Sequence, residues 1–444
     1  MRVMIIGSGY VGLCMGVVLA KAHEVTLVDI DKHKVDMIND GKSPIYETDI
    51  DEFLNNAIAR GTLIAKTTDD TFEPQDVIMI AVGTPSAEDG SVNLEYFQNA
   101  VDWIFSRESE LCNHEFCVIC VKSTVPPETT TNLVQTRIDK SNLSNRLATV
   151  FNPEFLREGK AIQDSLNPDR IVIGTDNPRA AQTIQSMYES CIENESTFVN
   201  LSRESAELCK YTSNCFLATK ISFANEIANI AEKIPNADIE DVMYGVGLDS
   251  RISPLFFGSG AGYGGSCFPK DTLGLILFAE RTYGVEVPIL HAVDSVNKVR
   301  PKKLVDLLLE CIPNLSGKKI ALLGLAFKPD TDDTRYSPTY KVIDLLHSEG
   351  ADVWIHDPMM KKILENVGPI PNIKIAETIE HCLSEADGCI LITDWSDYKS
   401  ESLEQLLSPM KTKIFIDGRR VFAKQPPSDN IIYRTIGVLS TCRD

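Results

Sequence analysis

The sequence predicts an α/β protein in which two doubly wound, Rossmann-like parallel sheets are joined by a long central helix. Short apolar runs alternate with helical stretches over residues 1–195, and the same alternation returns from residue 318. Between the two halves, the stretch from Ser202 to about Lys233 contains no β-type run and is long enough for one helix. We therefore expect three parts, at residues 1–198, 199–300 and 301–444.

Composition narrows the possible classes of protein. A chain of 444 residues is long enough for two or three domains with sizeable cores. Its net charge of −20 argues against a nucleic-acid or acidic-membrane partner. No apolar run approaches the roughly 20 residues of a membrane span. The apolar start of the chain breaks at Gly7, so we interpret it as a buried strand and not as a signal peptide.

The twelve cysteines are scattered through the chain without the paired spacing of metal ligands. Cys117 and Cys120 are the closest pair, and they lie in the apolar run 116–121, which is typical of a buried strand. We expect no metal site. A chain of this size does not need disulfides to fold, so a reducing cytoplasm is the expected location.

The first apolar run is residues 2–6, and Gly7-Ser8-Gly9-Tyr10-Val11-Gly12 and a helical stretch follow it. A second strand runs from Glu24 to Val28 and ends at Asp29. Strand, glycine turn, helix, strand and acid together form the fingerprint of dinucleotide binding. The glycines let a pyrophosphate approach the helix N-terminus. Asp29 can accept both ribose hydroxyls and repel a 2′-phosphate, which predicts NAD and not NADP.

Further apolar runs continue the first sheet, at residues 76–82, 116–122, 149–151 and 170–174. Thr84 follows the first of these runs and Thr124 follows the second. Ligands of doubly wound sheets bind beyond the carboxyl ends of the strands. We therefore expect both threonines to contact a cofactor or a sugar, although either one alone could be an ordinary turn residue.

The predicted central helix presents Lys210 and Asn214 on one face, because they are four residues apart. The same stretch contains many apolar residues, so much of its surface must be buried. We expect it to join the two halves and to form a dimer contact. A single helix lysine is more often solvated, so Lys210 alone would not indicate a site.

The most unusual stretch is residues 258–272, in which five glycines occupy eight positions up to Gly265. Such a loop tolerates positive φ and lets the backbone close on a ligand. Pro269 suits the first position of a helix, which places Cys267 just before a helix N-terminus with Lys270 nearby. Both features favour the nucleophilic thiolate. Asp271, four residues after Cys267, can face the same side of the first turn.

The second half begins with a helix and connection at residues 301–317, and its strands are expected at residues 318–324, 351–356, 388–393 and 413–416. Lys328, Arg335 and Arg419 follow strands, where cations suit a phosphate-bearing ligand. The tail from Lys424, with Pro426 and Pro427, is predicted to be a surface loop followed by a last short strand.

Three segments together resemble the NAD-dependent nucleotide-sugar 6-dehydrogenases, that is, the UDP-glucose/GDP-mannose dehydrogenase family. The segments are Gly7-Ser8-Gly9-Tyr10-Val11-Gly12, Asn152-Pro153-Glu154-Phe155-Leu156-Arg157-Glu158-Gly159 and Gly262-Tyr263-Gly264-Gly265-Ser266-Cys267-Phe268-Pro269-Lys270-Asp271. Many enzymes share the first, whereas the second and third together are highly specific. The resemblance extends over essentially the whole chain.

The resemblance implies a four-electron oxidation of UDP-glucose to UDP-glucuronate with two NAD⁺, GDP-mannose or another nucleotide sugar being the alternative substrate. Cys267 matches the nucleophile that forms a thiohemiacetal and then a thioester. Lys210 matches a lysine that stabilises oxyanions, with Asn214 as its partner. The remaining matches are residues that hold or activate water or act as a base in thioester hydrolysis: Asp271, Thr124 and Glu154.

The resemblance also assigns binding residues and a homodimer in which Arg251 reaches the substrate of the neighbouring subunit. The residues that match cofactor contacts are Gly7, Gly9, Tyr10, Val11, Gly12, Asp29, Lys34, Thr84, Thr124, Glu158 and Arg335. The residues that match contacts to the UDP-sugar are Glu154, Phe155, Leu156, Glu158, Lys210, Asn214, Arg251, Tyr263, Gly264, Lys328 and Arg419.

Two other classes of protein share part of this pattern. Two-electron β-hydroxyacid dehydrogenases join a dinucleotide-binding domain to a helical domain with a working lysine, but they need no cysteine nucleophile. An NAD-sensing regulatory protein would need the glycine fingerprint but would have no use for Glu154, Lys210, Cys267 and Asp271 together. The cysteine loop therefore favours the four-electron enzymes.

Overall fold

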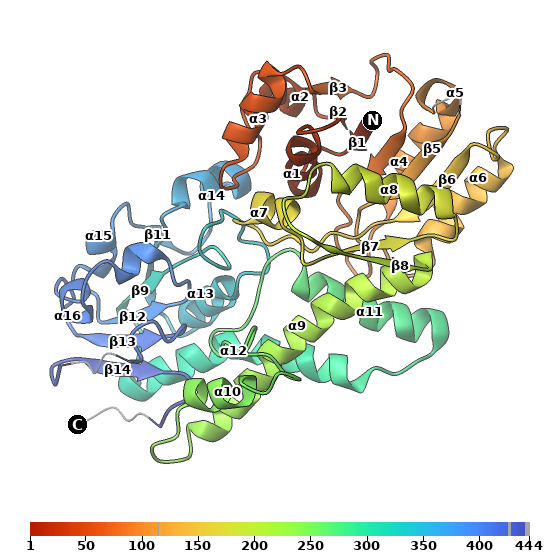
Figure 1. Ribbon diagram of the computed structural model, residues 1–444. Coiled ribbons are helices and arrows are strands. Elements are labelled where there is room, and N and C mark those ends of the chain that lie inside the picture. The colour runs from red at the N-terminus through yellow and green to blue at the C-terminus, as the bar shows by residue number, and fades with distance from the viewer. Residues whose placement is uncertain (113–114, 425–427, 440–444) are drawn as a thin grey trace. The chain divides into compact units, whose positions relative to one another are not determined.

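The computed structural model describes residues 1–112, 115–424 and 428–439 (Figure 1). The chain divides into two compact units, Met1–Ser213 and Asn214–Asp444. The expected loop at Pro426 and Pro427 lies outside the described residues.

The first unit is built on an eight-stranded sheet with the strand order β3-β2-β1-β4-β5-β6-β7-β8. All neighbouring strands are parallel except β6 and β7. The first six strands have the order of the dinucleotide-binding fold. The strands are β1 (Arg2–Ile6), β2 (Glu24–Asp29), β3 (Leu63–Thr67), β4 (Val77–Ile80), β5 (Cys117–Val121), β6 (Leu147–Phe151), β7 (Arg170–Gly174) and β8 (Thr197–Leu201).

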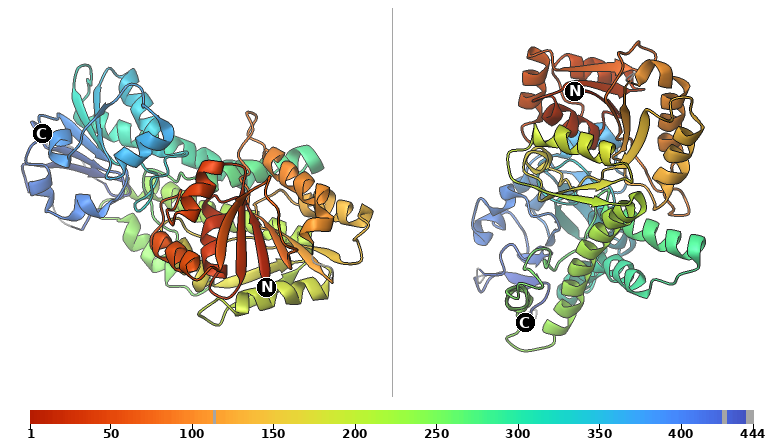
Figure 2. Two further views of the ribbon diagram at one scale, coloured as in Figure 1. Left: turned by 90° about the horizontal axis from the view of Figure 1, so that it is seen from above. Right: turned by 45° about the vertical axis from the view of Figure 1, so that its right-hand side comes forward.

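Helices cover both faces of this sheet (Figure 2). One apolar core lies between the sheet and α1, α2, α3, α7 and α8, and the other lies between the sheet and α4, α5, η1 and α6. The bounds are α1 (Tyr10–Leu19), α2 (Lys32–Asn39), α3 (Ile50–Ala59), α4 (Glu95–Ser106), α5 (Glu108–Leu111), η1 (Thr130–Gln135), α6 (Thr136–Lys140), α7 (Ala161–Leu166) and α8 (Pro178–Glu189).

The sequence did not reveal β3 and β8, the two edge strands of the sheet. In β3 the residues alternate between buried and more exposed, and no residue of β8 is fully buried. Edge strands that are half-buried carry polar residues and lack the continuous apolar run that marks a central parallel strand. The central strands were predicted because they have that run.

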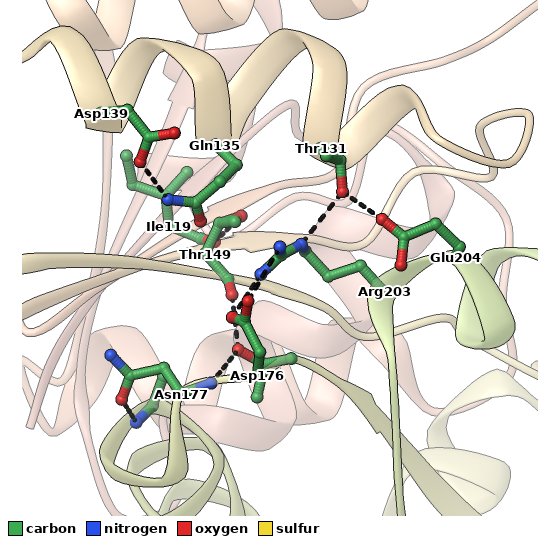
Figure 3. Close-up of polar contacts among 11 residues, drawn as sticks. Ile119, Thr131, Gln135, Asp139, Thr149, Asp176, Asn177, Arg203 and Glu204 are labelled. Atoms are coloured by element: carbon green, nitrogen blue, oxygen red, sulfur yellow. Dashed lines mark hydrogen bonds and ion pairs between the residues drawn. The ribbon is translucent and has the colours of Figure 1, made fainter.

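The predicted central helix is confirmed as α9 (Arg203–Ala231). Its start is fixed to the first unit by Arg203, whose guanidinium pairs with Asp176 at 2.6 Å and donates to Thr131 Oγ1 at 3.1 Å (Figure 3). Thr131 also donates to Glu204 on the first turn. These contacts fix the first turn of α9 to η1 and to the residue Asp176 that follows β7.

The second unit contains a six-stranded parallel sheet with the order β11-β10-β9-β12-β13-β14. Counted from its own first strand, this order is the same as that of the first six strands of the other sheet. The expected second doubly wound unit is therefore confirmed. The strands are β9 (Lys319–Leu323), β10 (Asp352–His356), β11 (Lys374–Ile375), β12 (Gly388–Leu391), β13 (Ile414–Asp417) and β14 (Ile432–Thr435).

The helices of the second unit are α10 (Ile239–Gly247), α11 (Phe268–Tyr283), α12 (Pro288–Cys311), α13 (Pro338–Ser348), α14 (Met360–Val367), α15 (Ile379–Leu383), η2 (Ser396–Lys399) and α16 (Leu403–Leu406). The expectation that a helix begins at Pro301 is wrong, since Pro301 lies inside α12. Proline weakens a helix interior. Apolar residues of α12 on both sides of Pro301, including Val293, Leu304 and Leu308, are buried and offset that cost.

Ten of the described cysteines are free. In the described parts of the chain no helix is both long and apolar enough to cross a membrane. Within the same residues, no three His, Cys, Asp or Glu side chains form a group that could hold a metal ion.

Candidate active site

The turn between β1 and α1 has the shape that a pyrophosphate requires. Gly7 has φ +96°, and a Cβ on Gly12 would lie 1.8 Å from the carbonyl oxygen of Gly7. Neither position tolerates a side chain. A Cβ on Gly9 would have no atom within 4 Å, so the backbone is open to a ligand at the N-cap of α1. The turn thus fits the dinucleotide predicted from its sequence.

Asp29 ends β2 and is bonded to this turn. Its Oδ2 accepts from the backbone N–H of Ser8 at 2.8 Å and from the Ser8 hydroxyl at 2.6 Å. Burial alone would raise the pKa of Asp29, but the bonds from Ser8 and Asp31 and the charge of Lys34 outweigh it and lower the pKa. Asp29 is therefore ionised where a ribose diol would be recognised.

The turns that follow β4 and β5 contact each other. Thr84 donates from its hydroxyl to the carbonyl oxygen of Thr124 at 2.8 Å. On the other side of the glycine turn, buried Glu47 bonds to the hydroxyl of Tyr10 and accepts from the N–H groups of Gly159 at 2.7 Å and Ala161 at 2.8 Å. Glu47 thus connects α1 to the segment after Glu158.

Glu154 and Lys210, both predicted to be catalytic, form a buried ion pair. Lys210 Nζ lies 2.9 Å from Glu154 Oε1, and the side chains are 3% and 9% exposed. Glu154 Oε2 accepts from the N–H of Leu156 at 2.7 Å. Burial alone would raise the pKa of Glu154, but the Lys210 charge, this bond and Lys122 outweigh it and lower the pKa. Glu154 is a carboxylate that could accept a proton.

The ring of Phe155 contacts two cations, Arg170 and Lys210. Arg170 lies over it, with the guanidinium carbon 3.7 Å from the ring centroid, and Lys210 Nζ is 5.3 Å from the same centroid. Cation–π contacts of this kind hold a ring in a fixed position. Phe155 therefore helps to orient the segment that carries Glu154.

In the second unit, Asn214 and Asp271 are also brought together. Asn214 Nδ2 donates to Asp271 Oδ2 at 2.6 Å, and Lys270 Nζ lies 2.5 Å from Asp271 Oδ1. Asp271 is 1% exposed, and its N–H donates to the carbonyl oxygen of Cys267 at 2.8 Å. The first turn of α11 therefore places Asp271 and Cys267 side by side, as the spacing predicted.

Cys267 is the N-cap residue of α11 and is exposed. Among the free cysteines of the described residues it is the only exposed one. Burial raises the pKa of Cys14, Cys120, Cys215 and Cys382 to about 12, so these thiols stay protonated. Cys267 combines accessibility with a helix N-terminus, which is what a nucleophilic thiol needs.

The glycines before Cys267 are needed for close packing of the chain against itself. A Cβ on Gly264 would lie 2.4 Å from the carbonyl oxygen of Tyr336, and one on Gly260 would lie 2.5 Å from that of Gly418. Gly265 has φ +83° and donates to the carbonyl oxygen of Arg335 at 2.8 Å. The positive φ predicted for this loop is confirmed at Gly262 (+95°) and Gly265, and these glycines let the loop pack tightly within the second unit.

Four of the predicted substrate or cofactor cations have different surroundings. Arg419 donates to the carbonyl oxygens of Ile392 at 2.6 Å and Gly262 at 3.0 Å, so it supports the cysteine loop. Arg335 is exposed and pairs with Asp333 at 2.7 Å.

Lys328 and Arg251 are the other two. Lys328 Nζ is 5.7 Å from the ring centroid of Phe327, whose side chain packs under Gly265. Arg251 is 85% exposed, and it pairs with Asp249 at 2.5 Å. The exposure of Arg251 is compatible with a contact to another molecule.

Sequence reasoning missed three buried residues that hold these segments in place: Lys122, Tyr188 and Glu47. Lys122 directly follows an apolar strand, and a charged residue at that position could have indicated a buried, paired lysine. Tyr188 and Glu47 lie far in sequence from the residues that they contact, and no local pattern marks them.

All three domains of one family match the chain. The NAD binding domain of the UDP-glucose/GDP-mannose dehydrogenase family matches residues 1–192, its central domain matches residues 204–299, and its UDP binding domain matches residues 321–424. The chain belongs to this family. It is an oxidoreductase family, and its cofactor is NAD, in agreement with the turn around Gly9 and Asp29.

Curated relatives and a solved structure extend the likeness to the full length. The chain is 38% identical to a UDP-glucose 6-dehydrogenase of Rickettsia bellii over 98% of the chain and 99% of that protein. It is 40% identical to one of Bacillus subtilis over 95% and 94%. A UDP-glucose dehydrogenase from Pyrobaculum islandicum has a TM-score of 0.89 and 37% identity, with 98% of each chain covered.

Proposed function

We propose that this protein is an NAD-dependent UDP-glucose 6-dehydrogenase that converts UDP-glucose to UDP-glucuronate through a covalent adduct on Cys267. The single observation that carries the proposal is the accessible thiol of Cys267 at a helix start, beside the buried pair of Asn214 and Asp271. A protein that only senses NAD, or a two-electron dehydrogenase, has no use for such a thiol.

The overall reaction converts one primary alcohol and one water into a carboxylate, transfers two hydrides to two NAD⁺ and releases three protons. NAD, when bound, supplies the hydride acceptor in both oxidations. In the first oxidation a negative charge develops on the C6 oxygen as its proton leaves. The Lys210 ammonium and the Asn214 amide stabilise this charge, one helical turn apart on α9.

In the second oxidation the Cys267 thiolate attacks the aldehyde carbon, and a carbon–sulfur bond forms while the carbonyl electrons move to oxygen. Loss of hydride from this thiohemiacetal gives a thioester. Water then attacks the thioester carbon, and the carbon–sulfur bond breaks to return the thiolate. Glu154, held ionised by Lys210, accepts the proton of that water, and Asp271 and Thr124 orient it.

We assign the binding of NAD and of the UDP-sugar to three parts of the chain, residues 1–198, 199–300 and 301–444. In this proposal the cofactor contacts are Gly7, Gly9, Tyr10, Val11, Gly12, Asp29, Lys34, Thr84, Thr124, Glu158 and Arg335. The contacts to the UDP-sugar are Glu154, Phe155, Leu156, Glu158, Lys210, Asn214, Arg251, Tyr263, Gly264, Lys328 and Arg419. The glycine turn with Asp29 and the cations of the second unit support this division.

The decisive experiment is the yield of NADH from limiting UDP-glucose, with GDP-mannose in parallel. We expect two NADH for each UDP-glucose and little turnover of Cys267→Ser. One NADH for each sugar would contradict the thioester route and favour a two-electron enzyme. If only GDP-mannose is oxidised, the thioester route stands, and the substrate is GDP-mannose, the other sugar nucleotide in the family's name.

The exposed face of α9 supports a homodimer. Phe216, Phe223 and Ile230 follow one another at seven-residue spacing, so they share one side of the helix. They are 62%, 49% and 53% exposed. A long helix with large apolar side chains in solvent is typical of an interface between chains. We place the dimer contact there.

We also place the enzyme in the cytoplasm. The proposed route needs Cys267 as a free thiol, and cytosolic reductants keep exposed thiols reduced. Nine further cysteines of the described residues are free as well. Fractionation of cells with detection of the protein would test this location.

A further inference from the structure

A buried ammonium lies behind the segment that carries Glu154. Lys122 follows β5 and is 4% exposed. Its Nζ is 2.8 Å from the hydroxyl oxygen of Tyr188, 3.0 Å from Asn152 Oδ1 and 3.3 Å from the carbonyl oxygen of Pro153. An ammonium has three N–H donors, so these three acceptors satisfy it completely. A neutral amine would leave one of the acceptors without a proton.

These contacts fix the position of Asn152 and Pro153, the two residues that directly precede Glu154. Asn152 accepts a second bond, from the Tyr188 hydroxyl at 2.6 Å, and donates to the carbonyl oxygen of Val172 at 2.8 Å. Pro153 has no N–H, so its carbonyl is its only backbone anchor. Lys122 therefore joins β5, β7 and α8 to the residue that directly precedes Glu154.

The segment needs such an anchor because it is not packed on all sides. A cavity of about 90 Å³ is lined by residues 152–157 together with Lys122 and Tyr188. Residues 152–157 are also outside any helix or strand. A segment that borders empty space has fewer van der Waals contacts to hold it, so polar bonds decide its position.

The charges near Glu154 do not cancel. Two ammonium groups, Lys122 and Lys210, influence this one buried carboxylate, and both lower its pKa. Burial, together with the effect of Lys210, lowers the pKa of Lys122 to about 8, so it is mainly charged at neutral pH. Cys120 and Tyr188 stay neutral, because burial raises the pKa of Cys120 to about 12 and that of Tyr188 well above 10. The other charged groups that line the cavity are Arg157, Asp164, Asp169 and Arg170.

We propose that Lys122 is a positioning residue for the oxidation: it holds the Glu154 segment against Lys210 and keeps Glu154 in its anionic form. The inference rests on the proposed function, because it assigns Lys122 a part in the same site. Lys122 acts through Glu154 and the Pro153 carbonyl. Its role therefore has two separable components, one of charge and one of geometry.

Lys122→Met removes the charge and keeps most of the side-chain volume. We expect kcat to fall by at least about tenfold, since small displacements of a catalytic group are costly, while KM for NAD stays within about twofold. The acid limb of the pH–rate profile should move to higher pH, because Glu154 loses a neighbouring cation. Hydrogen exchange at the Leu156 amide, which is bonded to Glu154, should become faster.

Tyr188→Phe changes the geometry and keeps the charge, and it covers the case in which Lys122→Met does not fold. We expect faster exchange at Leu156 and a several-fold loss of kcat, with the acid limb unchanged. Lys319→Met is the matched control. Lys319 also donates to two backbone carbonyls, of His381 and Ser384, but in the second sheet. The Lys319→Met variant should have a lower Tm but the same pH–rate profile as wild type.

The proposal is overturned if Lys122→Met gives the same pH profile and the same Leu156 exchange as wild type. It is also overturned if Tyr188→Phe leaves both kcat and the exchange unchanged. If wild-type protein releases no NADH from UDP-glucose, the proposed function fails. The exchange measurement alone then decides whether Lys122 holds the segment.

Discussion

At the scale of single residues, the charged groups around a buried carboxyl decide whether it is ionised. Glu154 and Glu207 are both buried, yet their pKa values move in opposite directions. Glu154 faces two ammonium groups, and they keep it ionised. Glu207 accepts from the N–H groups of Glu128 at 2.6 Å and Thr130 at 2.8 Å, but its burial, together with the charge of Glu204, outweighs its hydrogen bonds and raises its pKa to about 7.

Glu207 should therefore make folding depend on pH. In the unfolded chain it loses its proton near the ordinary value of 4.5, and in the folded chain near 7. The protonated side chain thus contributes stability that is complete below pH 4.5 and is lost as the pH rises through about 7. Glu207→Gln does not titrate. The Tm of this variant minus that of wild type should rise through this window and be level above it.

The control for this experiment is Glu189→Gln, at an exposed position at the end of α8. Its Tm difference should not rise across the same window. A flat difference for Glu207→Gln would show that Glu207 is ionised in the folded protein throughout.

At the scale of elements, contacts between residues distant in sequence connect the ligand-facing turns. Glu47 is the clearest case, because one carboxylate bonds to Tyr10 at the start of α1, to Gly159 and to the first residue of α7. The glycine turn and the segment after Glu158 are therefore fixed to each other. A change in either should affect NAD binding.

Glu47→Gln should raise KM for NAD about tenfold, while kcat changes less than about threefold. Glutamine is neutral and has one acceptor oxygen, so one of the two N–H groups loses its acceptor, which costs about 1.5 kcal/mol. Steady-state kinetics with varied NAD measure the effect. Glu52→Gln, at an exposed glutamate of α3, is the control and should match wild type. An unchanged KM for the Glu47 variant would show that the turn holds its shape without this bond.

At the scale of the whole molecule, two sheets that share the order of six strands divide the proposed recognition of ligands. The acid and the glycine turn expected to bind NAD lie in the first unit. Lys328 and Arg419, expected to bind the UDP-sugar, lie in the second. Each determinant sits beyond the carboxyl ends of strands, where this fold places its ligands.

Asp29→Ala should abolish the rise in Tm that NAD causes and keep the rise that UDP causes. A ligand at about 100 times its Kd stabilises the folded protein by about 2.7 kcal/mol, which is readily measured as a change in Tm. Asp36→Ala, on the exposed side of α2, should keep both rises. Loss of the UDP effect in the Asp29 variant would show that the two ligands do not bind independently.

Charges on the exposed face of α9 should separate the proposed dimer. The double variant Phe216→Glu with Phe223→Glu places two like charges in the contact and should run as a monomer in size-exclusion chromatography with light scattering, whereas wild type runs as a dimer. Val367→Glu replaces an exposed apolar residue of α14 and should leave the dimer intact. A wild-type monomer would contradict this use of α9.

The sequence by itself determined the central strands, the NAD turn, the long helix and the thiol at a helix start. These features have local causes: apolar runs, fixed spacings and glycine or proline at particular positions. The contact of Asp271 with Cys267, four residues apart, follows from such a short-range pattern.

Only the tertiary structure decided the edge strands, the continuation of α12 through Pro301, and the partners of the buried charges. Lys122, Asn152 and Tyr188 lie on three separate elements, and their bonds arise because the fold buries them together. The free energy of a buried charge depends on every group around it. No local pattern contains that information, so the roles of Lys122, Glu47 and Glu207 emerged only when the chain was folded.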